Sequence, residues 1–128
     1  MFKQNFIMGN QTISSTNSKQ IVLDFIEAMN QLDYEKARTY VTNDLSFVGV
    51  LGTRNGADAY FSDMQKMKFK YDIIKAFADG DDVCLIYNIN MGTETIFCFG
   101  WYQLQNEKIK TFRVVFDPRP LLEKTKKD

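Results

Sequence analysis

The sequence predicts an α+β fold in which three helices from the N-terminal half cover one face of a curved, mainly antiparallel sheet. Two observations lead to this prediction. Apolar residues recur at helical spacing in the first half of the chain and at every second position after Lys68. The stretch 93–117 then reads as two long strands joined by a polar turn at 105–107, because aromatic and β-branched residues dominate both arms. A strongly curved sheet covered in this way encloses a cone.

Three amphipathic helices are expected. The first begins with Ser18 as its N-cap, and a shorter second helix begins with Asp33 as its cap and ends near 42–44. The third helix follows the turn-rich segment 52–56. The apolar faces that we expect to turn inward are Ile21, Val22, Phe25, Ile26, Met29 and Leu32 in the first helix, Ala37, Tyr40 and Val41 in the second, and Tyr60, Phe61, Met64 and Met67 in the third.

The strands follow from alternation and from turn residues. A short strand is predicted over 45–51, before the third helix. After Lys68 the apolar phase slips by one residue, which predicts a β-bulge near Ile73. The acidic run 79–82 is a turn signal rather than a calcium loop, because the ligand spacing of such a loop is missing. A strand over 83–91 and a tight turn at 92–93 lead into the long hairpin, and Pro118 ends the sheet and starts an extended tail.

Both faces of the long hairpin are largely apolar. In its first arm Phe97, Phe99 and Trp101 alternate with Cys98, Gly100 and Tyr102. Each face therefore needs a cover, and the helices of one chain cover only one of them. We expect a second copy of the chain to cover the other face, which predicts a homodimer.

Composition limits the chemistry. Sixteen basic and sixteen acidic residues cancel, so no long-range field favours nucleic acid as a partner. Histidine is absent, which excludes zinc sites of the usual kind and Ser-His or Cys-His nucleophilic catalysis. Cys84 and Cys98 lie inside predicted strands without partners at metal-ligand spacing, and we expect them to be reduced. No metal and no cofactor is expected.

One domain is predicted for a chain of 128 residues with 45% hydrophobic residues. We expect a polar N-terminal arm over 1–17, a single domain over 18–121 and a charged tail over 122–128. The sequence shows neither a signal segment nor an apolar run of membrane-spanning length, so we expect a cytoplasmic protein that does not bind membranes.

Three segments carry a resemblance to a known family: FIEAMNQLDYEKARTYVTNDLSFVG, NGADAYF and IKTFRVVFDPRPL. Over about residues 18–121 the chain resembles the nuclear-transport-factor-2-like superfamily, and within it the SnoaL-like and ketosteroid-isomerase-like branch. The resemblance implies a cone-shaped fold with an internal pocket. Ketosteroid-isomerase-like members use an Asp base with a Tyr and a protonated Asp as an oxyanion hole. Alignment with them puts Gly49, Phe25 and Gly100 at these three places.

The resemblance also implies which side chains face the pocket. If Phe112, Val114 and Phe116 line it, Cys98, Gly100 and Tyr102 line it from the neighbouring strand. Tyr102, Asn88 and Asn90 are the side chains that we expect to orient a ligand, with Tyr60 and Tyr87 behind them. The candidate pocket residues are Phe25, Met29, Phe47, Tyr60, Met64, Asn88, Cys98, Tyr102, Phe112, Val114 and Phe116, and the candidate interface residues are Phe97, Phe99, Trp101, Arg113 and Val115.

Three functions remain open at this point. The first is a protein that binds a small hydrophobic molecule without the acid and base residues of the family's enzymes. The second is an isomerase, cyclase or hydrolase that acts on a hydrophobic molecule through Tyr102 and a carboxylate such as Asp44 or Asp58. The third is a dimerisation scaffold without a ligand. A deep pocket with a polar group at its floor would favour the second function, and a filled cone would favour the third.

Overall fold

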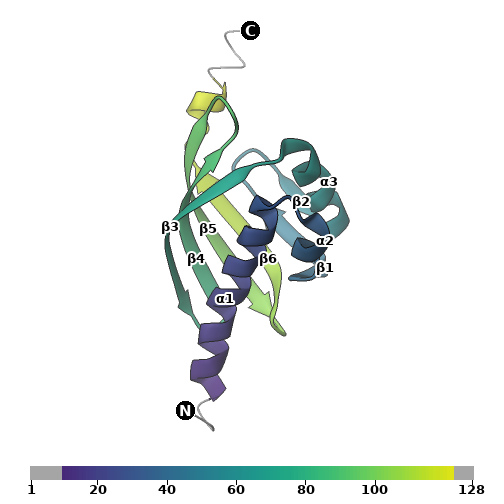
Figure 1. Ribbon diagram of the computed structural model, residues 1–128, viewed down its shortest axis with the longest axis vertical. Helices are drawn as coiled ribbons and strands as arrows, with labels where there is room; N and C mark the ends of the chain where they lie inside the picture. The colour runs from purple at the N-terminus through teal and green to yellow at the C-terminus, as the bar shows by residue number, and fades with distance from the viewer. Residues whose placement is uncertain (1–9, 123–128) are drawn as a thin grey trace.

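The computed structural model describes the backbone of residues 10–122 and the side chains of residues 17–122 (Figure 1). Part of the predicted N-terminal arm, residues 1–9, and most of the predicted tail, residues 123–128, lie outside this range. No helix within residues 10–122 combines the length and the apolar character needed to span a bilayer.

The described chain forms three helices and one six-stranded sheet, which confirms the predicted α+β class. The strand order is β2-β1-β6-β5-β4-β3, in which β3 to β6 form an antiparallel meander and β1 runs parallel to β6. The elements in chain order are α1 (Asn10–Asn30), α2 (Tyr34–Arg38), β1 (Val41–Val48), β2 (Thr53–Asn55), α3 (Ala57–Met67), β3 (Lys70–Asp79), β4 (Asp82–Asn90), β5 (Thr95–Gln105) and β6 (Lys108–Phe116).

The first helix begins earlier than the sequence predicts. Ser18 is not a cap but lies inside α1, where its buried hydroxyl donates a 2.6 Å hydrogen bond to the carbonyl of Gly80 in the β3–β4 turn. This tertiary bond uses the side chain that we expected to cap the helix. Residues 10–17, which we predicted to be part of an arm, belong to this helix. After α1, Leu32 adopts a left-handed conformation with φ 59° and stays exposed, so it falls outside the apolar stripe.

The second helix confirms its predicted cap but ends early. The Asp33 carboxylate accepts a 3.1 Å hydrogen bond from the backbone N–H of Lys36. The helix ends at Arg38, so Val41 begins β1 instead of continuing a helical face. The predicted strand over 45–51 thus starts four residues sooner, and the linker segment 53–55 pairs with it as β2.

The strand predictions from turns and phase are confirmed. The register of β3 against β4 shifts between Ile73 and Lys75, which is the expected bulge. At the β5–β6 turn, Asn106 and Glu107 have φ values of 52° and 65°, as a two-residue hairpin turn with the twist of the strands requires. The tail after Pro118 is a helical turn over 119–122 and not extended, because the fixed φ of proline suits the start of a helix.

The sheet has one buried and one exposed face. Along β4 and β5 burial alternates residue by residue, with Tyr87 and Cys98 inside and Phe97 and Phe99 outside. Helix α1 packs on β3 and β4 across the inner face, whereas α3 packs on β1 and β2 (Figure 1). The space between α3 and the inner face of the sheet is not filled completely, and it holds the candidate site.

Candidate functional site

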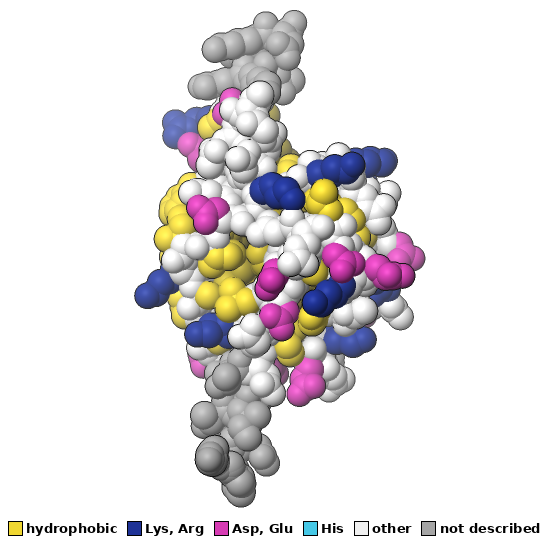
Figure 2. Space-filling model, in the orientation of Figure 1, with side chains coloured by type: hydrophobic (Ala, Val, Ile, Leu, Met, Phe, Trp, Pro, Cys, Tyr) yellow, Lys and Arg dark blue, Asp and Glu magenta, His cyan; other side chains and the backbone are white. Residues whose placement is uncertain are grey.

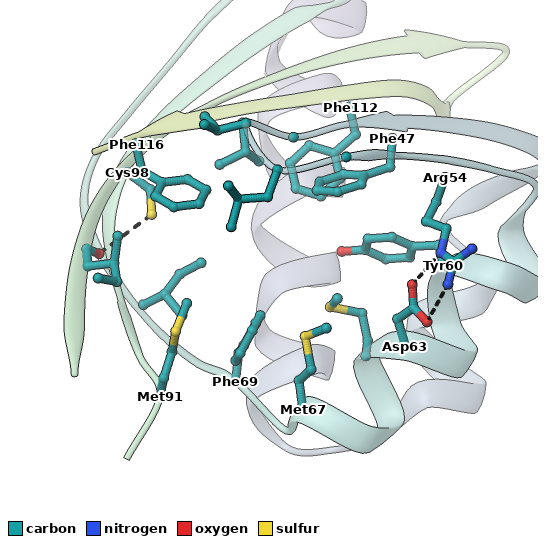
Figure 3. A pocket seen from close by; sticks show the side chains of 18 of the residues that line it. Phe47, Arg54, Tyr60, Asp63, Met67, Phe69, Met91, Cys98, Phe112 and Phe116 are labelled. Carbon is teal, nitrogen blue, oxygen red and sulfur yellow. Dashed lines mark hydrogen bonds and ion pairs between the residues drawn. The ribbon is translucent and has the colours of Figure 1, made fainter. Parts of the chain in front are cut away.

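A cavity of about 510 Å³ lies between α3 and the inner face of β3 to β6 (Figure 3). Its walls are mainly aromatic and aliphatic, and its rim includes the exposed Val50 and Leu51 of the β1–β2 connection. The lining residues are Phe47, Gly49, Val50, Leu51, Gly52, Thr53, Arg54, Tyr60, Asp63, Met64, Met67, Phe69, Tyr71, Tyr87, Ile89, Met91, Ile96, Cys98, Phe112, Val114, Phe116 and Leu121.

Several predicted pocket residues lie in this wall, namely Phe47, Tyr60, Met64, Cys98, Phe112, Val114 and Phe116. Alternation along β5 and β6 brings the last four together from two neighbouring strands, since Cys98 pairs with Phe116. Phe47 comes from β1 because β1 runs beside β6 and pairs Phe47 with Phe112, and the two rings lie 5.2 Å apart in an edge contact.

Four predicted pocket residues are placed elsewhere. Phe25 and Met29 belong to the packed core under α1, where the Phe25 ring meets those of Phe61 and Tyr102. Tyr102 is fully buried beyond the wall, stacked on Phe112 at 4.2 Å. Asn88 lies on the opposite face of the sheet, since it pairs with Phe97 and its neighbour Tyr87 points inward.

The side chain of Asn90, also expected to orient a ligand, lies on the same outer face. It accepts a 2.8 Å hydrogen bond from the backbone N–H of Gly92 and so stabilises the β4–β5 turn. Tyr87 of β4 pairs with Cys98 of β5, so the two side chains lie on the same, inner face of the sheet. Because cross-strand partners share a face, the inward position of Cys98 was the signal that excludes Asn88 and Asn90 from the cavity.

A tyrosine cluster lies beside the cavity, and it consists of Tyr60, Tyr71 and Tyr87, which line the wall, and Tyr102, which is buried behind it. Figure 3 shows the Tyr60 hydroxyl pointing into the cavity. The Tyr71 hydroxyl makes a weak 3.8 Å contact to the sulfur of Met64 and also interacts with the hydroxyl of Tyr60. The buried hydroxyls of Tyr87 and Tyr102 lie near each other but have no hydrogen-bond partner. Burial raises the pKa of all four phenols, so each stays protonated and can donate at neutral pH.

Gly100 allows the tyrosines to approach one another. A Cβ at this position would lie 3.0 Å from Cε1 of Tyr102 and 3.1 Å from Cε1 of Tyr87. Any larger residue would therefore displace one of the two rings. Of the other two positions that the resemblance assigns to catalysis, Gly49 lies in the cavity wall and Phe25 in the packed core.

One ion pair that was not predicted from the sequence borders the cavity. Arg54 of β2 donates to the Asp63 carboxylate of α3 from Nε at 2.6 Å and from Nη2 at 3.2 Å (Figure 3). This hydrogen bond lowers the pKa of Asp63 and raises that of Arg54. The two residues are nine positions apart in different elements, so no periodicity in the sequence connects them.

Within the described residues, Asp63 is the one carboxylate in the cavity wall. Asp44 and Asp58, the carboxylates considered from the sequence, are exposed and lie outside it. Asp44 accepts a 2.7 Å hydrogen bond from Lys110, which lowers its pKa, and Asp58 lies 3.8 Å from Arg38. No group of three potential metal ligands occurs among residues 10–122.

Both cysteines are free thiols, and they lie on opposite faces of the sheet. The Cys98 thiol donates a 3.5 Å hydrogen bond to the carbonyl of Ile96 at the cavity wall (Figure 3). Burial raises its pKa to about 11, so it is a thiol and not a nucleophilic thiolate at neutral pH. Cys84, on the outer face, is only partly buried.

The fold and the cavity define a cone-shaped α+β domain that encloses an apolar chamber, and comparison with known proteins identifies its family. The family model of the SnoaL-like domain matches residues 22–112, so the chain belongs to the SnoaL-like domain family. This confirms the resemblance inferred from the sequence. No curated protein matches the chain.

Solved structures support the same fold. An NTF2-like protein of unknown function from Cytophaga hutchinsonii is 44% identical, with a TM-score of 0.80 over 82% of this chain and 94% of that one. An LEH-like epoxide hydrolase of M. tuberculosis is 19% identical, with a TM-score of 0.74 over 85% of this chain and 89% of its own. A de novo designed protein with a curved β-sheet is 17% identical, with a TM-score of 0.74 over 87% and 95%.

Proposed function

We propose that this protein binds a small hydrophobic molecule in the cavity between α3 and the sheet. The observation that carries the proposal is the 510 Å³ chamber with mainly apolar walls in a domain that is otherwise closely packed. Cavities of roughly 300–1,000 Å³ with apolar walls and a few polar groups are typical of small-molecule sites. A scaffold without a ligand would gain stability from filling such a space, so the unfilled chamber favours binding over pure dimerisation.

A catalytic function takes second place because of the state of the cavity carboxylate. A general base needs a free lone pair and a pKa near the working pH. Asp63 instead receives two hydrogen bonds from Arg54, and its pKa is lowered, which makes it a weaker base. Isomerase, cyclase or hydrolase activity would therefore require this ion pair to separate first. An Asp63→Asn variant that abolished turnover of a hydrophobic ketone or epoxide would support that alternative.

The binding proposal is tested with a neutral, environment-sensitive dye such as Nile red and a matched pair of variants. Val114 points into the cavity, whereas its neighbour Val115 is exposed on the other face of β6. Val114→Phe should fill part of the chamber and weaken dye binding at least about tenfold, a loss of about 1.4 kcal/mol. Val115→Phe makes the same chemical change outside the cavity and should leave the affinity unchanged. Equal effects of the two variants would mean that the dye binds elsewhere.

We also propose that the outer face of the sheet is a homodimer interface. Phe97, Phe99, Trp101 and Val115 have 53%, 47%, 43% and 51% of their surface exposed. Cross-strand pairing makes them contiguous, since Phe99 pairs with Val115 and Trp101 with Arg113. Contiguous aromatic area of this kind on a monomer is typical of an interaction site.

The dimer proposal is tested by sedimentation with two variants. Trp101→Glu places a charge in the middle of the outer face and should yield a monomer or an insoluble protein. Leu51→Glu places the same charge on an exposed leucine at the cavity rim and should leave the oligomeric state unchanged. A monomeric unmodified protein at micromolar concentration would refute the proposal without affecting the cavity.

Charge and thiols support two further expectations. Acidic and basic side chains are interspersed over the face seen in Figure 2, as the balanced composition predicts, which gives no support to a nucleic-acid partner. The free thiols of Cys84 and Cys98 suit a reducing compartment such as the cytoplasm.

A further inference from the structure

We propose that Arg54 is a head-group site at the mouth of the chamber and that the ligand is an amphipathic monocarboxylate. The apolar part of such a ligand lies in the chamber, and its carboxylate accepts hydrogen bonds from the Nη1 and Nη2 edge of the Arg54 guanidinium. This inference rests on the proposed binding function and adds the chemical class of the ligand.

The first step is the position of Arg54 between the chamber and the solvent. Arg54 lines the cavity, yet 55% of its side-chain surface is exposed. It pairs with Phe47 across β1 and β2, so its side chain leaves the sheet on the same face as the Phe47 ring. Figure 3 shows the guanidinium on the α3 side of the cavity, away from Cys98 and Phe116. A ligand in the chamber can therefore place one polar end at Arg54.

The second step is the set of donors that Arg54 has free. Asp63 accepts one N–H from Nε at 2.6 Å and one from Nη2 at 3.2 Å. Among the residues that the structure describes, none accepts a hydrogen bond from Nη1 or from the second N–H of Nη2. This edge forms a second fork, whose parallel N–H groups match the two oxygens of a carboxylate. A hydroxyl offers a single oxygen without charge and gains less from the same fork.

The third step is the balance of charge at the mouth. The hydrogen bond from Arg54 lowers the pKa of Asp63, and the positive charge of Lys66 on α3 lowers it further. Two cations thus act on one carboxylate, which leaves an excess of positive charge. A ligand carboxylate on the free edge lies nearer to the guanidinium than to Asp63, so attraction exceeds repulsion. Because Arg54 is partly exposed, the carboxylate also keeps part of its hydration, which limits the cost of desolvation.

The test uses three ligands with the same alkyl chain and different head groups, namely decanoate, 1-decanol and decylammonium. Their affinities are measured at neutral pH by displacement of Nile red from the chamber. We expect decanoate to bind about tenfold more tightly than decylammonium, which the excess positive charge repels. Added salt should weaken the binding of decanoate and should not weaken that of 1-decanol.

Two variants at the mouth should act in opposite directions. Arg54→Gln removes the charge and the fork and should reduce decanoate affinity about fivefold to tenfold, with 1-decanol unchanged. Asp63→Asn removes the competing carboxylate and should raise decanoate affinity by about twofold to fivefold, a gain that damage to the fold would not produce. Arg38→Gln is the matched control, because Arg38 also lies near an aspartate of α3, Asp58 at 3.8 Å, and neither residue lines the cavity. Folding of each variant is checked by circular dichroism.

The outcomes separate this inference from the proposed function. Equal affinities of the three ligands, or decanoate binding that Arg54→Gln leaves unchanged, would refute the head-group site and leave the apolar binding site standing. Tightest binding of decylammonium would refute it as well and would point to Asp63. Nile red that binds but is displaced by none of the three ligands would also refute the head-group site alone. If neither Nile red nor any of the ligands binds, the proposed function fails and the inference fails with it.

Discussion

Replacement of Tyr102 by Phe should stabilise this protein, although most substitutions of a fully buried residue destabilise. The Tyr102 hydroxyl is inaccessible to solvent and has no hydrogen-bond partner. Its ring stacks on Phe112 at 4.2 Å with an interplanar angle of 20° and meets Phe25 edge-on. Phenylalanine keeps these ring contacts and removes only the unsatisfied oxygen.

The magnitude follows from the cost of a buried unpaired hydroxyl. Such a group costs about 1–3 kcal/mol, and the small void left by the oxygen takes back part of the gain. We therefore expect Tyr102→Phe to raise the free energy of unfolding by about 1 kcal/mol, which raises the melting temperature of a domain of this size by roughly 3–6 °C. This gain equals the stability that the unpaired Tyr102 hydroxyl costs the protein.

Urea unfolding provides the assay, with Tyr34→Phe as the control of opposite sign. The midpoint of Tyr102→Phe should rise at an unchanged m-value, because the exposed surface on unfolding is the same. Tyr34 donates a 3.3 Å hydrogen bond to the carbonyl of Met64, so Tyr34→Phe should lower the stability by about 0.5–1.5 kcal/mol. If Tyr102→Phe is destabilised in the same way, the Tyr102 hydroxyl has a partner such as an ordered water, and the reasoning about unpaired donors is wrong.

Three further predictions follow from single contacts. Gly100→Ala should destabilise by about 1–3 kcal/mol in urea unfolding, since its Cβ would meet Tyr102 and Tyr87, whereas Gly52→Ala, whose Cβ meets nothing within 4 Å, should be close to neutral. Because the pKa of Asp63 is lowered, its ion pair contributes fully to the free energy of unfolding above pH 3.8, and this contribution is lost as the pH falls through the lower folded-state pKa. Asp63→Asn should therefore make the stability less dependent on pH on the acid side. An unchanged acid limb would show that the pair contributes nothing to stability. Cys98, with its pKa raised to about 11, should react with a thiol reagent far more slowly in the native protein than in urea, and fast native labelling would show that the cavity wall opens readily.

The parts of the fold set by local residues could be predicted from the sequence. The β5–β6 hairpin, the bulge after Ile73 and the Asp33 cap each depend on residues within a few positions of one another. The start of α1 and the turn over 119–122 could not be predicted in this way. Ser18 has a capping side chain, yet its hydrogen bond goes to Gly80, far along the chain, and only the tertiary fold brings the two together.

The sequence predicts which residues lie on the inner face of the sheet, but not which of them reach the cavity wall. Alternation correctly put Cys98, Phe112 and Val114 on the inner side of the sheet. Whether an inward residue lines the cavity or belongs to the packed core depends on the distance between the curved sheet and α3. No residue pattern in the sequence predicts that distance. Tyr102 therefore lies behind the wall and not in it. The ion pair of Arg54 with Asp63 could not be predicted either, because it joins a short edge strand to a helix.

The central claim is that the chamber between α3 and the sheet holds a small hydrophobic ligand. A crystal structure of the protein soaked with Nile red tests it directly. We predict density for the dye between Phe47, Phe112 and Met64. An empty chamber at saturating dye, or dye bound only outside the chamber, would contradict this claim.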